Sequence, residues 1–122
     1  MAKKILIVED DNFLQGLASR KLQKDGFEVA IASNSIEAWK ALEGGKIDLV
    51  LLDLLLPNVD GFEILKKMKE NPETKDIQVI VFSNLSEEKD IKRAKDLGAS
   101  EFMVKANFTL DELAEKVKST LK

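Results

Sequence analysis

The sequence contains no cysteine and no histidine, and it has only two prolines. Without cysteine the chain forms no disulfide bond and no thiolate metal site. Without histidine, any chemistry that needs an imidazole must borrow that group from a partner molecule. A metal site built by this chain alone would therefore use oxygen ligands, which favours Mg²⁺ or Mn²⁺.

The chain also lacks a long apolar run and a strong excess of one charge. No segment approaches the roughly 20 residues of a membrane span. Residues 1–4 lead into an apolar run that is too short for a signal peptide and ends in carboxylates. The net charge is only -3, and lysine and arginine are spread along the sequence rather than gathered in a basic stripe. We therefore expect a cytoplasmic protein that enters no membrane and binds no nucleic acid.

The apolar residues that are present occur in short runs separated by longer amphipathic segments. The chain has 122 residues, 44% of them hydrophobic and 34% charged, which fits one domain over residues 1–122. Most of the short runs are continuously apolar, a pattern typical of strands buried on both faces of a parallel sheet. These predicted strands cover residues 5–8, 29–32, 49–52, 77–82 and 102–104.

Five helical segments are predicted between and after these strands. Leu14, Leu17, Ala18 and Leu22 form one face of the first helix, and Gly26 is placed to end it. The second helix covers residues 35–43 and is expected to turn its apolar side chains inward: Ile36, Trp39 and Leu42. The remaining helices are expected to begin at these positions: Asp60 as N-cap, Ser86, and Thr109 as N-cap.

This order, strand then helix repeated five times, predicts an α/β fold. Parallel strands need right-handed crossovers, so the expected structure is a doubly wound, five-stranded parallel sheet between two helix layers. A flavodoxin-like strand order of 2-1-3-4-5 would place the first and third strands side by side.

Polar groups follow four of the five predicted strands, at the edge where a doubly wound sheet binds its ligands. The first strand is followed by Glu9 and Asp10, the third by Asp53, the fourth by Ser83 and the fifth by Lys105. Converging carboxylates repel one another, and one lysine does not balance them, so a bound divalent cation is expected. A carboxylate beside Mg²⁺ can attack a phosphoryl group, with a hydroxyl and an ammonium stabilising its oxygens.

Taken together, these segments resemble the receiver domain of two-component response regulators over the whole chain. The segments that carry the resemblance are Lys-Ile-Leu-Ile-Val-Glu-Asp-Asp at 4–11, Asp-Leu-Val-Leu-Leu-Asp at 48–53 with Pro57 and Asp60-Gly61, Val-Ile-Val-Phe-Ser at 79–83, and Gly-Ala-Ser-Glu-Phe-Met-Val-Lys at 98–105.

The resemblance implies a magnesium site built around the phosphoryl acceptor. Asp53 would accept the phosphoryl group and also bind the metal. Asp10 would be a direct ligand, Glu9 would act through water, and the backbone carbonyl of Leu55 would complete the protein ligands. The donor would be a phosphohistidine on a sensor histidine kinase or a histidine phosphotransfer protein, consistent with a chain that has no histidine of its own.

The resemblance also implies a switch. Ser83 would hydrogen-bond a phosphoryl oxygen and move toward it, Lys105 would pair with Asp53 or its phosphate, and the ring of Phe102 would rotate inward. The reading of Phe102 as ordinary core stays open. Asp11 and Asn12 are interpreted as the cap of the first helix, with a supporting role for Asp11 at the metal as the alternative.

Two departures from the family pattern affect the site. Ala106 stands where the family has a proline preceded by a cis bond, so either a strained cis bond is kept or the loop is rebuilt around a trans bond. Leu55 and Leu85 would flank the path of a hydrolytic water. Because apolar side chains cannot orient water, slow self-dephosphorylation is predicted. Residues 54–56 are expected to lie on a loop that either binds a partner or covers the site.

The leading hypothesis is a phosphorylation-controlled switch, not an enzyme, that changes its helix 4–strand 5–helix 5 face. Since the chain has no second domain, its output would be another protein, as in stand-alone chemotaxis or phosphorelay regulators; we expect a monomer or weak dimer. Alternatives are a degenerate receiver that is never phosphorylated and an aspartate-nucleophile phosphatase, although Leu55 stands where such enzymes carry a second aspartate. A nucleotide-binding protein is disfavoured because the glycine-rich phosphate motifs are absent.

Overall fold

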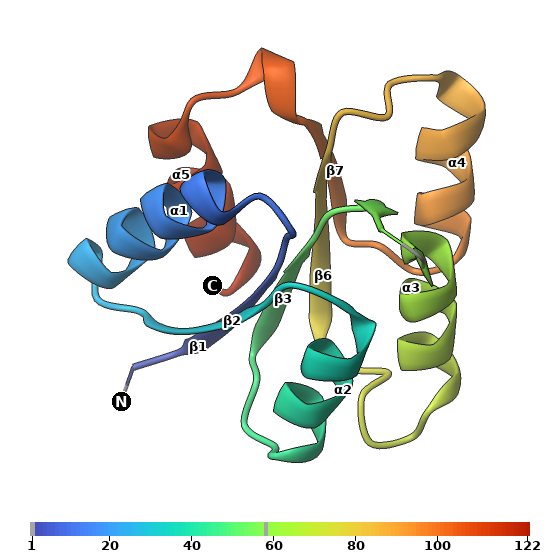
Figure 1. The fold of residues 1–122 in the computed structure, drawn as a ribbon, viewed down its shortest axis with the longest axis horizontal. Helices are drawn as coiled ribbons and strands as arrows, with labels where there is room; N and C mark the ends of the chain where they lie inside the picture. The colour runs from blue at the N-terminus through green and yellow to red at the C-terminus, as the bar shows by residue number, and fades with distance from the viewer. Residues whose placement is uncertain (1, 58) are drawn as a thin grey trace.

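Five parallel strands form the central sheet in the order β2-β1-β3-β6-β7 (Figure 1). The computed structural model describes residues 2–57 and 59–122. Each predicted apolar run forms a strand, and the predicted order is confirmed, since β6 and β7 are the fourth and fifth strands of this sheet. The strands are β1 Lys4–Val8, β2 Glu28–Ala32, β3 Leu49–Leu52, β6 Gln78–Ser83 and β7 Glu101–Val104.

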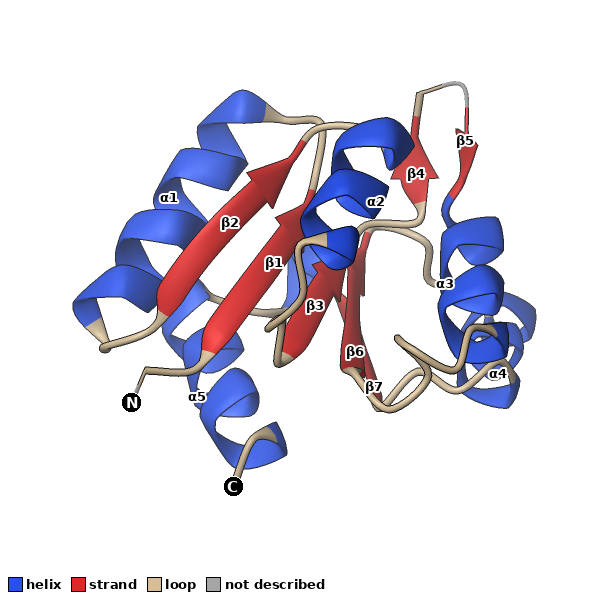
Figure 2. Ribbon diagram, turned by 90° about the horizontal axis from the view of Figure 1, so that it is seen from below, coloured by secondary structure: helices blue, strands red, loops and turns tan. Residues whose placement is uncertain are grey.

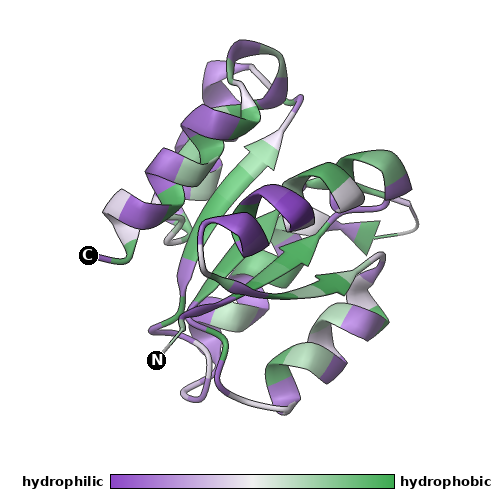
Figure 3. Cartoon of the chain, turned by 90° about the vertical axis from the view of Figure 1, so that its left-hand side faces the viewer, coloured by the Kyte–Doolittle hydropathy of each residue, from purple (hydrophilic) through white to green (hydrophobic). Residues whose placement is uncertain are grey.

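Helices cover both faces of the sheet, which makes three layers (Figure 2). One face packs against α1 (Asn12–Lys24) and α5 (Leu110–Thr120). The other packs against α2 (Ser35–Glu43), α3 (Gly61–Glu70) and α4 (Glu88–Asp96). Figure 3 shows the hydrophobic residues concentrated in the strands and on the helix surfaces that face them. Within the described part of the chain, no helix is long and apolar enough to cross a bilayer.

The helix ends explain why these segments begin and stop where they do. Asp11, Asp60 and Thr109 cap α1, α3 and α5 by accepting hydrogen bonds from backbone N–H groups of the first turn. Glu112 completes a capping box at α5 by accepting from the N–H of Thr109 at 2.9 Å. Gly26 follows α1 with a φ of 98°, a conformation that glycine adopts without strain. These ends match the sequence-based predictions.

Two helical predictions were wrong in detail. The fourth helix begins at Glu88 rather than at Ser86, because Glu87 keeps an extended backbone and acts as an N-cap without a side-chain hydrogen bond. Ile36 does not turn inward: its side chain is 69% exposed at the first turn of α2. Trp39 is half-buried and packs against the core from the edge of that helix. The prediction for Leu42 is confirmed, since Leu42 is buried on the inward face of α2 together with Ala38.

The segment after β3 is more regular than the predicted loop. The strands β4 (Leu55–Leu56) and β5 (Val59–Asp60) form a small antiparallel sheet between Asp53 and α3. Leu54 and Leu56 are buried, whereas Leu55 between them is 51% exposed. Because successive side chains of an extended chain point to opposite sides, Leu54 and Leu56 point into the protein and Leu55 points to solvent.

Candidate functional site

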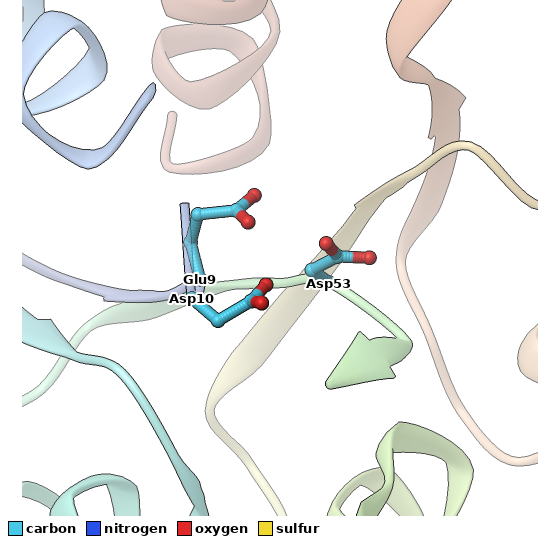
Figure 4. Close-up of side chains that lie close together, drawn as sticks. All are labelled: Glu9, Asp10 and Asp53. Atoms are coloured by element: carbon cyan, nitrogen blue, oxygen red, sulfur yellow. The ribbon is translucent and has the colours of Figure 1, made fainter. Parts of the chain in front are cut away.

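Three carboxylates converge at the carboxyl edge of the sheet (Figure 4). Glu9 and Asp10 follow β1, and Asp53 follows the neighbouring strand β3, whose Leu52 lies opposite Val8. One oxygen from each side chain lies within 4.8 Å of the others. Glu9 and Asp53 are buried, and Asp10 is exposed to solvent. The structure thus brings together the three acidic residues that the sequence singled out.

Backbone hydrogen bonds to the neighbouring strands continue past the strand ends as far as Asp53 and Glu9. The N–H of Asp53 donates to the carbonyl of Val8 at 3.0 Å, and the N–H of Glu9 donates to the carbonyl of Ala32 at 2.9 Å. The carboxylates are held as well: Asp53 Oδ1 accepts from the N–H of Leu55 at 3.0 Å, and Glu9 Oε2 accepts from the N–H of Asp11 at 3.1 Å. The acidic side chains therefore stand on a rigid frame.

Lys105 reaches two of the carboxylates from the end of β7. Its Nζ lies 2.8 Å from Asp53 Oδ2 and 2.5 Å from Glu9 Oε1. The bond between Lys105 and Ala106 is trans, and residues Lys105–Asn107 form a turn of 3₁₀ helix. Of the two outcomes considered for this departure, the rebuilt loop is the one observed. Lys105 is nevertheless placed against Asp53, so a proline after it is not required for that contact.

Burial and ion pairing shape the protonation of these groups. Burial raises the pKa of the Glu9 carboxyl above its ordinary value, and the hydrogen bond from Lys105 only partly opposes this effect. Burial also acts to lower the pKa of Lys105. The hydrogen bonds to Asp53 and Glu9 outweigh it, so the pKa of Lys105 lies above its ordinary value. Lys105 is accordingly a fixed positive charge beside Asp53 at neutral pH.

The residues present fit a small divalent cation. The cluster has three carboxylates against the single charge of Lys105, and its ligand atoms are all oxygens, as Mg²⁺ prefers. Two oxygens bound to one Mg²⁺ lie at most about 4.2 Å apart, twice a bond of about 2.1 Å. Neighbouring oxygens in such a shell lie only about 3 Å apart, so the three oxygens, now within 4.8 Å of one another, would have to draw closer, or one would have to bind through water.

The other predicted residues lie around this centre. Ser83 ends β6, the strand beside β3, and is fully buried, and its Oγ accepts from the N–H of Leu85 at 3.4 Å. Phe102 lies on β7 opposite Val81, half-buried against the core beneath α2, α3 and α4. The backbone N–H of Leu55 donates a hydrogen bond to Asp53 Oδ1. Their roles in metal binding and switching stay predictions.

Asp11 is the N-cap of α1: its Oδ1 accepts from the N–H groups of Phe13 at 2.9 Å and Leu14 at 3.2 Å. The capping interpretation of Asp11 is therefore confirmed. The capping interpretation of Asn12 was wrong, because Asn12 is the first residue of the helix and the cap is Asp11 alone.

Sequence reasoning missed the part that Gly61 plays. A Cβ on this residue would lie 2.4 Å from Leu54 Cα and 3.0 Å from the carbonyl oxygen of Asp53. Such distances are below van der Waals contact, so only glycine lets α3 begin this close to the strand end that carries Asp53. The N–H of Gly61 also donates to the carbonyl of Leu54 at 3.2 Å. The only sequence signal was the Asp-Gly pair at the predicted helix start.

The family model for the response regulator receiver domain matches residues 5–118. The chain belongs to that family. Among curated proteins it is similar to sporulation initiation phosphotransferase F of Bacillus subtilis (strain 168), with 37% identity over 121 residues, 99% of this chain and 95% of the relative. It also matches longer transcriptional regulators, and it spans about half of their length.

Solved receiver structures are similar over nearly the whole chain. A CheY-like receiver domain protein from Methanospirillum hungatei JF-1 has a TM-score of 0.91 and 27% identity, with 99% of this chain and 94% of that chain covered. The Mn²⁺-bound form of response regulator Rcp1 has a TM-score of 0.85 and 28% identity, with 98% and 95% covered. Receiver domains are signalling switches rather than classical enzymes; they bind Mg²⁺ in an acidic pocket and interact with histidine kinases and output domains.

Proposed function

We propose that this receiver takes a phosphoryl group from a partner phosphohistidine onto Asp53, and that this modification switches its binding to an output protein. The observation that carries the proposal is the position of Asp53: it lies at the end of a buried strand, beside the acidic pair, and its Oδ2 contacts the ammonium of Lys105. A nucleophile, cation ligands and a positive charge for the phosphoryl oxygens thus share one edge of the sheet.

The transfer exchanges one bond to phosphorus for another. A carboxylate oxygen of Asp53 attacks the phosphorus atom and forms an acyl phosphate. The P–N bond of the phosphohistidine breaks, and its electron pair returns to the imidazole nitrogen. In the unphosphorylated protein the Lys105 ammonium is hydrogen-bonded to Asp53 Oδ2. Because its raised pKa keeps it protonated, it would hydrogen-bond a phosphoryl oxygen after the transfer. Positioning and charge stabilisation supply most of the catalysis in such transfers.

Glu9, Asp10 and Asp53 would hold the metal, with the backbone carbonyl of Leu55 as a further ligand. A bound Mg²⁺ neutralises the charge that gathers on the phosphoryl oxygens. Asp10, the exposed member of the three, is the side chain best able to take a cation directly from solvent. Glu9 is already paired with Lys105, which suits a contact through water rather than direct binding.

The switch would run from Ser83 to the face formed by α4, β7 and α5. Ser83 is buried beside the strand that carries Asp53, so its hydroxyl has a short path to a phosphoryl oxygen. Phe102 lies on β7, next to β6, and packs toward α4. Movement of Ser83 would open space for this ring and alter the α4–β7–α5 face, to which the output partner would bind. The protein would work in the cytoplasm as a monomer or weak dimer.

The direct test is incubation with acetyl phosphate and Mg²⁺, read by intact mass. One added phosphoryl group is expected, and it should be lost with EDTA and in Asp53→Asn. Asp96→Asn is the matched control, since it removes an exposed carboxylate from α4 and should leave the adduct unchanged. An unmodified wild-type mass at saturating Mg²⁺ and donor would contradict the proposal and favour a degenerate receiver.

A phosphatase acting on free substrates is the competing chemistry. It needs an acid or base next to the nucleophile, and the side chain two residues after Asp53 is the apolar Leu55. Steady-state turnover of a small phosphomonoester separates the two: a switch should release no more than about one equivalent of phosphate during its phosphate lifetime.

A further inference from the structure

Gln15 places an uncharged amide within the buried face of α1. The residue is 7% exposed and lies in helical register with the buried residues Ala18 and Leu22. A buried amide is costly unless it is hydrogen-bonded. Its Nε2 donates to the backbone carbonyl of Glu9 and, at 2.9 Å, to Ser33 Oγ. The side chain therefore joins the helix to two loops.

These bonds form a chain of contacts across the carboxyl edge of the sheet. The N–H of Ser33 donates to Glu37 Oε1 at 2.7 Å, so the contacts run from Glu9 through Gln15 and Ser33 to the first turn of α2. The N–H of Glu9 is held separately by the carbonyl of Ala32. Glu9 thus has its N–H fixed by the end of β2 and its carbonyl fixed by Gln15.

The carbonyl of Glu9 belongs to the peptide unit that joins Glu9 to Asp10. Fixing this unit fixes the direction in which both acidic side chains leave the backbone. Mg²⁺ demands near-octahedral oxygen geometry, and groups that orient the ligands commonly change metal affinity by about 10- to 100-fold. The ligand oxygens of the acidic cluster lie within 4.8 Å of one another, so the direction in which each side chain leaves the backbone decides whether they can reach one ion together.

We propose that Gln15 is a positioning residue for the acidic pair: it holds the Glu9–Asp10 peptide unit and so sets the Mg²⁺ affinity without touching the metal. This inference rests on the proposed function. Gln15→Met, which has a similar length but no donor, should weaken Mg²⁺ binding by about tenfold. The rate of phosphorylation by acetyl phosphate should fall at low Mg²⁺ and recover at saturating Mg²⁺.

Ser33→Ala is the matched control, because it removes the second partner of Gln15 and leaves the bond to Glu9. Mg²⁺ affinity is measured by calorimetry on the unphosphorylated protein, and the free energy of unfolding by urea titration without metal. In Ser33→Ala the affinity should stay within about twofold of wild type. A merely structural role for Gln15 would lower stability in both variants without separating their Mg²⁺ affinities.

Gln15→Asn is the milder second variant, should Gln15→Met not fold: it keeps an amide but shortens the side chain by one methylene, so the Glu9 carbonyl lies out of reach. It should weaken Mg²⁺ binding in the same direction. Wild-type Mg²⁺ affinity in a folded Gln15 variant, with Asp53 still phosphorylated, overturns the positioning role alone. A wild-type protein that binds no Mg²⁺ or forms no adduct instead contradicts the proposed function.

Discussion

The two helices that flank β7 are held to the sheet very differently. α5 buries Leu113, Ala114 and Val117 and begins with a capping box, whereas α4 buries only Ala94 and has no side-chain cap. Segments with few buried apolar groups open at lower free energy than the core. The α4–β7–α5 face therefore combines a helix with a broad buried apolar side and a helix with a narrow one, and we expect α4 to open at lower free energy than α5.

Truncating one apolar side chain in each helix gives the largest contrast. Leu113→Ala removes a side chain that is 1% exposed and should lower the free energy of unfolding by about 2–5 kcal/mol. Ile91→Ala, in a half-buried position of α4, should cost roughly 1 kcal/mol or less. Urea denaturation measures both changes, and equal losses would contradict the contrast between the helices.

The first residue of α3 is expected to tolerate an added side chain poorly. Gly61→Ala places a methyl group against the Asp53–Leu54 backbone, and we expect a loss of about 1–3 kcal/mol in unfolding free energy together with slower phosphorylation. Gly16→Ala is the control, since its Cβ would meet nothing within 4 Å and alanine favours a helix by up to about 1 kcal/mol. A Gly61→Ala protein as stable as wild type would show that this close approach is unimportant.

The lifetime of the phosphate should depend on the two leucines beside the site. Leu55 is 51% exposed on β4 and Leu85 is half-buried after β6, and neither can orient a water because both side chains are apolar. Replacing both with asparagine should shorten the lifetime on Asp53, on the order of tenfold, since positioned polar groups commonly contribute more than this to such reactions. The decay is followed by intact mass after donor removal, and an unchanged lifetime would count against the prediction of slow self-dephosphorylation.

The smallest expected effect concerns the contact that ties α4 to α3. The guanidinium of Arg93 lies 4.1 Å from the centre of the Phe62 ring and 4.0 Å from Asp60 Oδ2, largely in solvent. Arg93→Met should lower the local opening free energy of α4 by about 0.5–1 kcal/mol, seen as roughly two- to fivefold faster amide exchange in α4 alone. Lys95→Met, on the exposed side of the same helix, is the control and should leave exchange unchanged.

The sequence predicted those parts of the fold that local patterns determine. Continuous apolar runs located all five strands of the main sheet, because strands buried on both faces need apolar residues at every position. Asp60 and Thr109 identified two helix starts, because N-caps favour a few residue types. The exposure of Ile36 and the β4–β5 pairing were missed. Both depend on which neighbour the tertiary structure supplies, and a three-leucine run reads equally well as loop or strand.

The site was predictable for a related reason: its residues follow strands, and parallel strands end at one edge. The family resemblance predicted that Lys105 pairs with Asp53, but the sequence did not show how the chain continues past Ala106, which the structure resolves as a 3₁₀ turn over Lys105–Asn107. Gln15 left a faint signal, a polar residue in register with Ala18 and Leu22. A buried hydrogen bond to a loop carbonyl has no spacing rule that would have identified its partner.

The central claim, that Asp53 accepts the phosphoryl group, is tested most directly by locating the modification. After treatment with acetyl phosphate and Mg²⁺, borohydride reduces an acyl phosphate to an alcohol, which converts the modified aspartate to homoserine. Peptide mapping should find homoserine at position 53 and nowhere else. Homoserine at position 10 or at another carboxylate, or a peptide with an unchanged Asp53 from protein that carries the phosphoryl group, would contradict the account.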